Sequence, residues 1–333
     1  MTTIISLVLL AAVFFVILGH GADLLVGNLR ALADKTKIHP VLLGTILGFL
    51  TTMPEFMVGL NAVRQGVPTL SLGNIWGGII VIFALILGTS IILQREIKTD
   101  GRLVVILPSF ILIIFSLFLG LKGQLHYYDG LLLIAFYLVL IYLDYLAGGH
   151  YQADTSTEKA VLAAENKQEA WRHWSERFLF WRRELSRETL WAVIGLCLVS
   201  VASYAIMEIA DIALGIFPLP PFLVGLLIFA IGTNLPEITV MLRSLKTKSG
   251  DLSFGHLVGS AVSNVLVLAL LTFLTPVSIN ISWRYYFLIL AVFILLSVVS
   301  LFYVTRRRFN RWEGLVLMAL YFLFVVCELF VRW

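Results

Sequence analysis

The sequence predicts an all-α integral membrane protein: ten transmembrane helices in two inverted five-helix repeats, with broken helices at the midplane. Hydrophobic residues make up 60% of the 333 residues and charged residues only 13%, which excludes an ordinary soluble domain. Ten apolar runs are close to the roughly 20 residues that a helix needs to cross a bilayer. A Pro-Glu pair also lies inside an apolar run in each half, at Pro54 with Glu55 and at Pro236 with Glu237.

The first five spans form the first repeat, residues 1–147. Asp23 lies in the first span and no basic residue precedes Arg30, so we expect no cleaved signal peptide, which needs a positive start. The second span carries Glu55. The five expected spans are 4–29, 40–63, 71–94, 103–121 and 127–147.

The second repeat, residues 189–333, contains the other five spans. Spans four, five, nine and ten hold few polar residues near their centres, so we expect them to be scaffold. Cys197 and Cys327 lie inside spans, where cysteine behaves as a small hydrophobe, and neither a disulfide nor a zinc site is predicted. The expected spans are 189–216, 221–242, 254–275, 283–304 and 313–331.

The one long polar segment, residues 148–188, is expected to be a linker. In its second part, aromatic and leucine side chains recur every three or four residues with arginines between them: Trp171, Trp174, Phe178, Trp181 and Leu185. This pattern favours an amphipathic helix on an anionic leaflet. The alternative is a linker packed between the two halves.

The placement of the basic residues predicts the orientation. Twenty of the 24 lysines and arginines fall in the odd-numbered loops, counting from the first span, and four fall on the other side. The positive-inside rule then places both termini outside and the linker in the cytoplasm. We expect a multi-pass protein of the plasma (inner) membrane that contacts lipids. The basic surplus does not indicate nucleic-acid binding, and no protein partner is implied.

The two halves share a motif that indicates duplication. An offset of 182 residues places Thr51 on Thr233, and it also pairs the two Pro-Glu motifs and the glycines 73 with 255 and 77 with 259. Because five spans is an odd number, the second repeat must begin on the opposite side of the membrane. Inverted repeats with irregular helices at their interface are typical of secondary transporters.

The glutamates predict an ion site. Placing a carboxylate near the bilayer centre costs roughly 2.5–3.5 kcal/mol of free energy on lenient scales. We therefore expect Glu237 to have a function at this position. Thr233 lies one helical turn before it, and Gly232 and Pro236 weaken the backbone ladder and free carbonyl oxygens. Such a set of oxygens suits a hard cation. A single glutamate could instead be a structural hydrogen-bonding residue, but two related by inversion favour a shared cavity with Glu55.

Other polar and small residues are weaker candidates for the ion site. Glu208 and Asp23 could line a path or lie near helix ends. For Gly73, Gly77 and Gly78 we favour close helix packing, which small residues permit in membranes. Asn74 is interpreted as structural or close to solvent.

The sequence GTNLPE at 232–237, followed by KSGDLSFGHLVGSAVSN at 248–264, resembles the second signature repeat of the cation/calcium antiporter superfamily, which includes sodium/calcium exchangers. TTMPE at 51–55 and LGNIWGG at 72–78 resemble an atypical first repeat, and GADLLVGNLRALA at 21–33 resembles the segment before it. The resemblance implies an antiporter rather than an enzyme, without a cofactor. It also implies these ion ligands: Glu55, Glu237, Thr51, Thr52, Thr233, Asn234, Ser260, Ser263 and Asn264.

The resemblance also implies a mechanism. Two facing carboxylates in a low dielectric would repel each other, and one would hold a proton in the absence of a cation. Calcium, sodium ions or protons can each neutralise the pair, but not together. We therefore expect calcium to exchange for sodium or protons by alternating access.

The third span departs from the family pattern. Gly78, Ile79 and Ile82 stand opposite Ser260, Ala261 and Asn264 at the same offset, and Leu50 replaces an expected glycine. Fewer oxygens than the six to eight that calcium prefers keep a proton-coupled exchanger of another metal or of a monovalent cation as an alternative. A membrane-embedded enzyme acting on lipids is the alternative from another class, although the six histidines are scattered. A structural or interaction protein would not need buried carboxylates in both halves.

Overall fold

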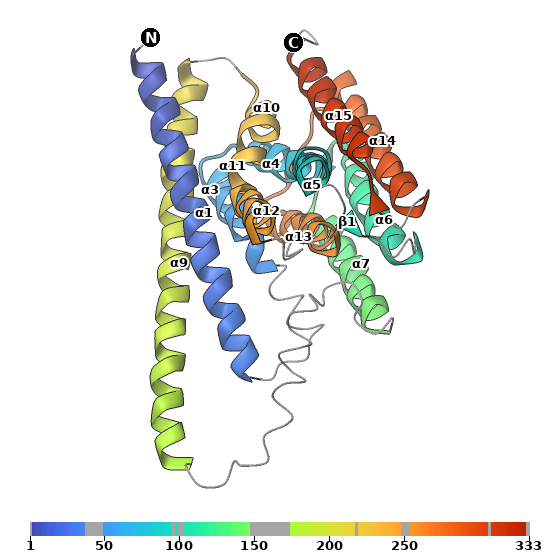
Figure 1. Cartoon of the computed structure of the whole chain (residues 1–333). Helices are drawn as coiled ribbons and strands as arrows, with labels where there is room; N and C mark the ends of the chain where they lie inside the picture. Colours follow the sequence, from blue (N-terminus) through green and yellow to red (C-terminus); the bar gives the residue numbers. More distant parts are fainter. Residues whose placement is uncertain are drawn as a thin grey trace.

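The computed structural model describes residues 2–36, 49–94, 97–98, 103–146, 174–216, 219–247, 254–305 and 308–330. Within them the chain is almost entirely helical, with four strands of two residues each (Figure 1). In the first half the elements are α1 (Thr2–Thr36), α3 (Met53–Arg64), α4 (Pro68–Ile80), the π-helix η1 (Val81–Ile86), α5 (Leu87–Gln94), β1 (Ile97–Lys98), α6 (Leu103–Leu119), the 3-10 helix η2 (Gly120–Lys122), β2 (Gln124–Leu125) and α7 (Tyr127–Leu146).

The second half follows the same order of long helices. Its elements are α9 (Trp174–Ile216), α10 (Pro221–Val224), the π-helix η3 (Gly225–Phe229), α11 (Ala230–Thr233), α12 (Leu235–Thr247), α13 (Phe254–Thr272), β3 (Val277–Ser278), α14 (Trp283–Thr305), β4 (Arg308–Phe309) and α15 (Arg311–Phe330).

Seven segments of the described chain are long and apolar enough to cross a membrane: Ser6–Leu29, Pro68–Leu93, Arg187–Ile216, Pro221–Leu242, Phe254–Thr272, Trp283–Thr305 and Arg311–Phe330. Two shorter apolar helices, Ile106–Lys122 and Tyr127–Leu143, coincide with the expected fourth and fifth spans. The expected second span, 40–63, is described only from residue 49 onward. The prediction of a multi-span helical membrane protein is therefore confirmed in its coarse form.

Two long helices, α1 and α9, pack side by side along one flank of the molecule (Figure 1). They approach closely through two glycines: a Cβ added to Gly21 would lie 3.0 Å from the Gly195 carbonyl oxygen. The segment expected to lie on the leaflet is helical from Trp174 and continues without a break into the sixth span. No glycine or proline stands between Trp174 and Gly195 to end the helix. The linker residues before Trp174 lie outside the described residues.

The most buried span is the one formed by α4, η1 and α5. Helix α4 crosses α10 and η3 with backbone against backbone. A Cβ on Gly73 would lie 2.0 Å from the Phe222 carbonyl oxygen, and one on Gly77 would lie 2.4 Å from that of Leu226. Only glycine fits at such an approach. The packing role predicted for Gly73 and Gly77 is confirmed.

Two strand pairs connect the halves. Strand β1, between α5 and α6, pairs antiparallel with β4, between α14 and α15. Strand β2, between α6 and α7, pairs antiparallel with β3, between α13 and α14. Strands β1 and β3 occupy equivalent places in the two halves, and so do β2 and β4. The β1–β4 pair is therefore the counterpart of the β3–β2 pair when the two halves are exchanged. Helix α6 therefore runs from the first pair to the second, whereas α14 runs from the second pair to the first.

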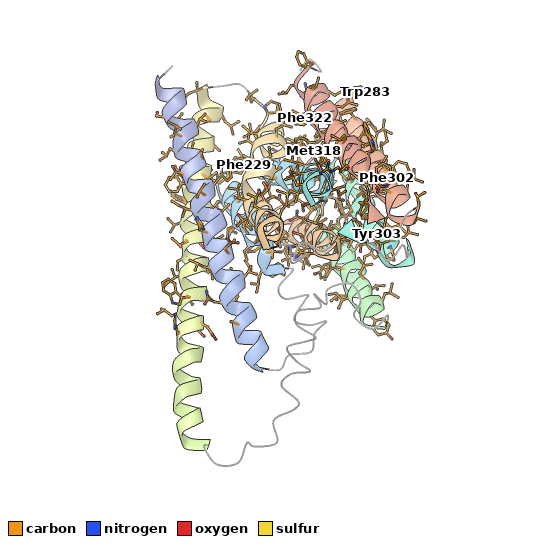
Figure 2. The ribbon with its side chains drawn as sticks, viewed as in Figure 1. Phe229, Trp283, Phe302, Tyr303, Met318 and Phe322 are labelled. Atoms are coloured by element: carbon orange, nitrogen blue, oxygen red, sulfur yellow. The ribbon has the colours of Figure 1, made fainter. Side chains whose placement is uncertain are left out.

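The outer faces carry large apolar side chains that no part of the described chain covers. Trp283 at the start of α14 is 77% exposed, and Phe322 of α15 is also exposed (Figure 2). Such a surface suits a lipid environment rather than water. The core below it contains the largest fully buried side chains, Trp76 and Phe83.

Candidate functional site: two buried carboxylates at paired helix breaks

The site begins at two breaks in the helices. Thr52 has φ −92° and ψ 12°, and α3 starts after it; Asn234 has φ −86° and ψ 15°, and α12 starts after it. These two residues stand at equivalent positions of the repeat, 182 residues apart. Each turns its side chain back to an upstream carbonyl: Thr52 Oγ1 donates to Phe49 O (2.8 Å) and Asn234 Nδ2 donates to Ala230 O (2.8 Å). The motif therefore has the same local geometry in both halves.

Each break places a glutamate in the first turn of the following helix. Glu55 of α3 is 1% exposed and Glu237 of α12 is 2% exposed. The N-terminus of a helix favours a negative charge, which partly offsets the cost of burying a carboxylate. The two carboxylates lie close enough to interact electrostatically. The structure thus brings the two predicted glutamates within electrostatic range of each other.

A hydroxyl group lies beside each carboxylate. Ser260 Oγ of α13 donates to Glu237 Oε1 at 2.8 Å. The Thr233 hydroxyl lies close to the Glu55 carboxyl. The second oxygen of each carboxylate, Oε2 in both residues, is buried and has no hydrogen-bond partner within the described part of the chain.

Asn74 of α4 is a further residue at this site. It is fully buried, and its Oδ1 lies 3.0 Å from Thr233 Oγ1. The Thr233 hydroxyl also has Phe229 O at 3.0 Å. The interpretation of Asn74 as structural agrees with its hydrogen bond to Thr233, whereas the alternative of a place close to solvent is wrong because the residue is fully buried. Its contact with the second motif was not predicted, although its spacing of four residues from Gly78, which puts the two on one helix face, could have indicated it.

The predicted ligands of α13 are all buried: Ser260 2%, Ser263 1% and Asn264 0% exposed. Ser263 lies next to the Tyr137 hydroxyl of α7. Neither amide atom of Asn264 has a hydrogen-bond partner in the described chain. A Cβ added to Gly78 would lie 3.1 Å from Asn264 Nδ2 and 3.0 Å from Asn234 Nδ2, so two amides of the second half lie against this glycine of the first half.

The remaining predicted residues have different places. Thr51 is 9% and Thr52 1% exposed, and both precede Glu55 at the break. Asp23 of α1 lies close enough to Glu237 to interact with it electrostatically. Glu208 of α9 instead accepts a hydrogen bond from Gln65 Nε2 (3.0 Å) at an exposed position beyond the end of α3.

The side chains of the site are suited to holding a cation through their oxygen atoms. Its donors are two carboxylates, hydroxyls and side-chain amides; groups of three or more histidine, cysteine or acidic residues are absent from the described residues. A buried polar atom without a partner costs roughly 1–3 kcal/mol, more if charged. The carboxylate and amide oxygens of Glu55, Glu237, Asn234 and Asn264 that have no partner among the described residues would be satisfied by a cation, a proton or water.

The family described as sodium/calcium exchanger protein matches residues 6–146 and 188–330 of this chain. The putative antiporter CaxA of Alkalimonas amylolytica is 28% identical over 320 residues, which cover 93% of this chain and 96% of that protein. The sodium/calcium exchanger MaX1 of Methanosarcina acetivorans is 22% identical over 373 residues, covering 99% and 100%.

Two solved structures share the fold. The sodium-calcium exchanger NCX_Mj superimposes with a TM-score of 0.62 at 22% identity, covering 95% of this chain and 98% of that one. The H+/Ca2+ exchanger CAX superimposes with a TM-score of 0.70 at 17% identity, covering 98% and 82%.

Proposed function

Because this chain belongs to the sodium/calcium exchanger protein family, we propose that it is a secondary active antiporter that exchanges calcium for sodium ions or protons. It is a membrane transporter of inorganic cations and not an enzyme. The observation that carries the finer proposal is the pair Glu55 and Glu237, buried side by side at equivalent helix breaks, each with an oxygen that lacks a partner in the described chain.

Competition for this pair explains exchange. Two ionised carboxylates that interact electrostatically in a low dielectric repel each other, so the pair needs positive charge. A calcium ion, sodium ions or protons can supply it, but they cannot share the same oxygens. One kind of ion must leave before another binds, which couples their movements. The site requires no resident cofactor.

The ligand set that we propose combines both halves. Glu55, Thr51 and Thr52 would come from the first break, Glu237, Thr233 and Asn234 from the second, and Ser260, Ser263 and Asn264 from α13. The span of α4 has Gly78, Ile79 and Ile82 where the second repeat has its polar residues. Asn74 of α4 would supply a side-chain oxygen instead. This asymmetry supports one divalent site, and it keeps a proton-coupled exchanger of another metal or of a monovalent cation as the second candidate.

Alternating access requires two halves that can exchange conformations. We propose two inverted five-helix repeats, within ten spans, joined by the linker 148–188. The matching dihedral angles at Thr52 and Asn234 and the exchangeable strand pairs support this arrangement. The distribution of basic residues supports an orientation with both termini outside and a cytoplasmic linker, and we propose that the membrane is the plasma (inner) membrane.

The test is uptake of radioactive calcium by liposomes that contain the purified protein, under an imposed sodium or proton gradient. Gradient-driven uptake is expected for the native chain and for Glu208→Gln, a matched change to an exposed carboxyl. It should be lost in Glu55→Gln and Glu237→Gln. Uptake that survives in both of these variants would refute the site, and the effective gradient identifies the counter-ion.

A further inference from the structure

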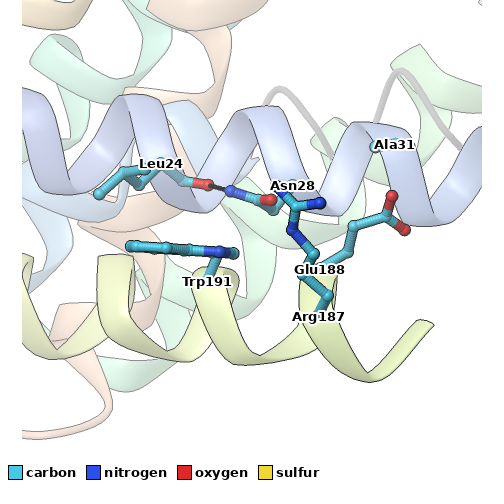
Figure 3. A pocket seen from close by; sticks show the side chains of 6 residues that line it. All are labelled: Leu24, Asn28, Ala31, Arg187, Glu188 and Trp191. Carbon is cyan, nitrogen blue, oxygen red and sulfur yellow. Dashed lines mark hydrogen bonds between the residues drawn. The ribbon is translucent and has the colours of Figure 1, made fainter. Parts of the chain in front are cut away.

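A second site lies between α1 and α9, away from the paired glutamates. A cavity of about 440 Å³ is lined by Leu24, Asn28 and Ala31 of α1 and by Arg187, Glu188 and Trp191 of α9. Figure 3 shows the three side chains of α9 extending toward α1. The volume is within the range of small-ligand pockets, about 300–1,000 Å³.

The cavity lies where the apolar parts of both helices end. In the sequence, the apolar run of α1 is followed by Arg30, and that of α9 is preceded by Arg187 and Glu188. Leu24 and Asn28 are therefore just inside the apolar stretch, and Ala31 is just beyond it. Tryptophan and arginine are the residues that anchor helices at lipid headgroup depth. A ligand here would meet headgroups on one side and acyl chains on the other.

The charges of the lining are of both signs. The Arg187 guanidinium can hold a phosphate oxygen pair with two parallel N–H donors. The Glu188 carboxylate is adjacent in sequence and lines the same cavity, where it would repel a simple anion and attract an ammonium group. Asn28 Nδ2 already donates to Leu24 O at 2.7 Å, which turns its amide oxygen, an acceptor, toward the remaining space (Figure 3).

We propose that this cavity binds an aminophospholipid headgroup, with the phosphodiester on Arg187 and the primary ammonium toward Glu188 and the Asn28 oxygen. The Trp191 ring and Leu24 would contact the glycerol and the first methylenes of the acyl chains. Both charged groups of such a headgroup meet a group of opposite sign. A lipid with an anionic headgroup and no amine would place no positive group toward Glu188.

Occupancy would connect lipid composition to the transport site. Helix α1, which forms one wall of the cavity, also carries Asp23 beside Glu237 and Phe15 against Gly232. A bound headgroup bridges α1 and α9 on the side where the two helices leave the apolar stretch. It would stabilise their relative position without contacting the transported ion.

The experiment is native mass spectrometry of the full chain with phosphatidylethanolamine, phosphatidylglycerol or phosphatidylcholine that have the same acyl chains. We expect one preferentially retained phosphatidylethanolamine, and about tenfold weaker retention in Arg187→Gln, since a charge-assisted hydrogen bond is lost. Ala31→Trp, which fills the cavity and keeps its charges, should also lose the lipid. Glu188→Gln should abolish the preference for the amine while keeping phospholipid binding.

Arg311→Gln is the matched control. Arg311 begins α15 beside the exposed Trp312, so it offers the same residue types at a span boundary without this cavity. Equal loss of lipid in Arg187→Gln and Arg311→Gln, or equal retention of phosphatidylglycerol and phosphatidylethanolamine by the native chain, would overturn the proposal. The assay detects bound lipid rather than flux, so its result is independent of the proposed exchange activity.

Discussion

The close crossing of α4 over α10 and η3 predicts that Gly73→Ala destabilises the protein. The added Cβ would stand 2.0 Å from the Phe222 carbonyl oxygen and 2.8 Å from the Leu226 backbone nitrogen. Neither obstacle is a flexible side chain that can move aside. A separation of about 1 Å would be needed to reach even a tight contact of 3.0 Å.

The magnitude follows from two opposing effects. Replacing a helical glycine by alanine stabilises a helix by about 0.5–1 kcal/mol. Overpacking of a well-packed core costs about 1–3 kcal/mol and occasionally more. Because the obstacles are backbone atoms, we expect the upper end of the overpacking cost, and hence a net loss of about 2–2.5 kcal/mol. Because Asn74 follows Gly73 directly, the same displacement should weaken its contact with Thr233 and lower calcium transport.

The measurement is thermal unfolding of the purified protein, followed by tryptophan fluorescence, together with calcium uptake. Gly27→Ala in α1 is the control, since a Cβ there would meet nothing within 4 Å. It should be neutral or slightly stabilising. If Gly73→Ala unfolds at the same temperature as Gly27→Ala and transports normally, the reasoning from the helix crossing is refuted.

Three more outcomes are expected at the ion site. Ser260→Ala removes the donor to Glu237 and should weaken calcium binding about tenfold, measured as the half-saturating concentration for uptake. Asn74→Leu keeps the volume but removes the amide at Thr233, and a fall in affinity of about fivefold is expected; unchanged affinity would exclude Asn74 from the site. Calcium at 100 times its dissociation constant should stabilise the native protein by about 2.7 kcal/mol, and an equal shift in Glu55→Gln would contradict the site.

Ser90→Ala serves as the control for these substitutions. Ser90 is fully buried in α5, so its replacement tests whether losing any buried hydroxyl affects calcium affinity. We expect no change in the half-saturating concentration.

Local chemistry made part of this structure predictable. The Pro-Glu pairs indicated both helix breaks, because proline at the start of a helix interrupts the preceding ladder of hydrogen bonds. The closely spaced glycines of α4 indicated close helix packing, because small residues let two helix backbones approach. The nearly continuous apolar runs indicated a multi-span helical membrane protein and the approximate bounds of the spans that the structure describes.

Features that depend on how distant segments meet could not be predicted in this way. Asn74 is at the site only because Gly73 and Gly77 let α4 approach η3. The sequences of the π-helices η1 and η3 do not distinguish them from ordinary apolar α-helix. The segment from Trp174 has an amphipathic pattern that suits either a surface helix or an extension of α9, and the pattern does not decide between them.

The two short strand pairs have a consequence for biosynthesis. Each pair joins a loop of the first half to a loop of the second, so neither can close before the ribosome has made its partner strand in the second half. Until then, β1 and β2 present unpaired edges, which can bind other chains. Chain synthesis would be nearly complete when Phe309 pairs with Ile97, so premature termination before that residue should leave a product that is prone to aggregation and degradation.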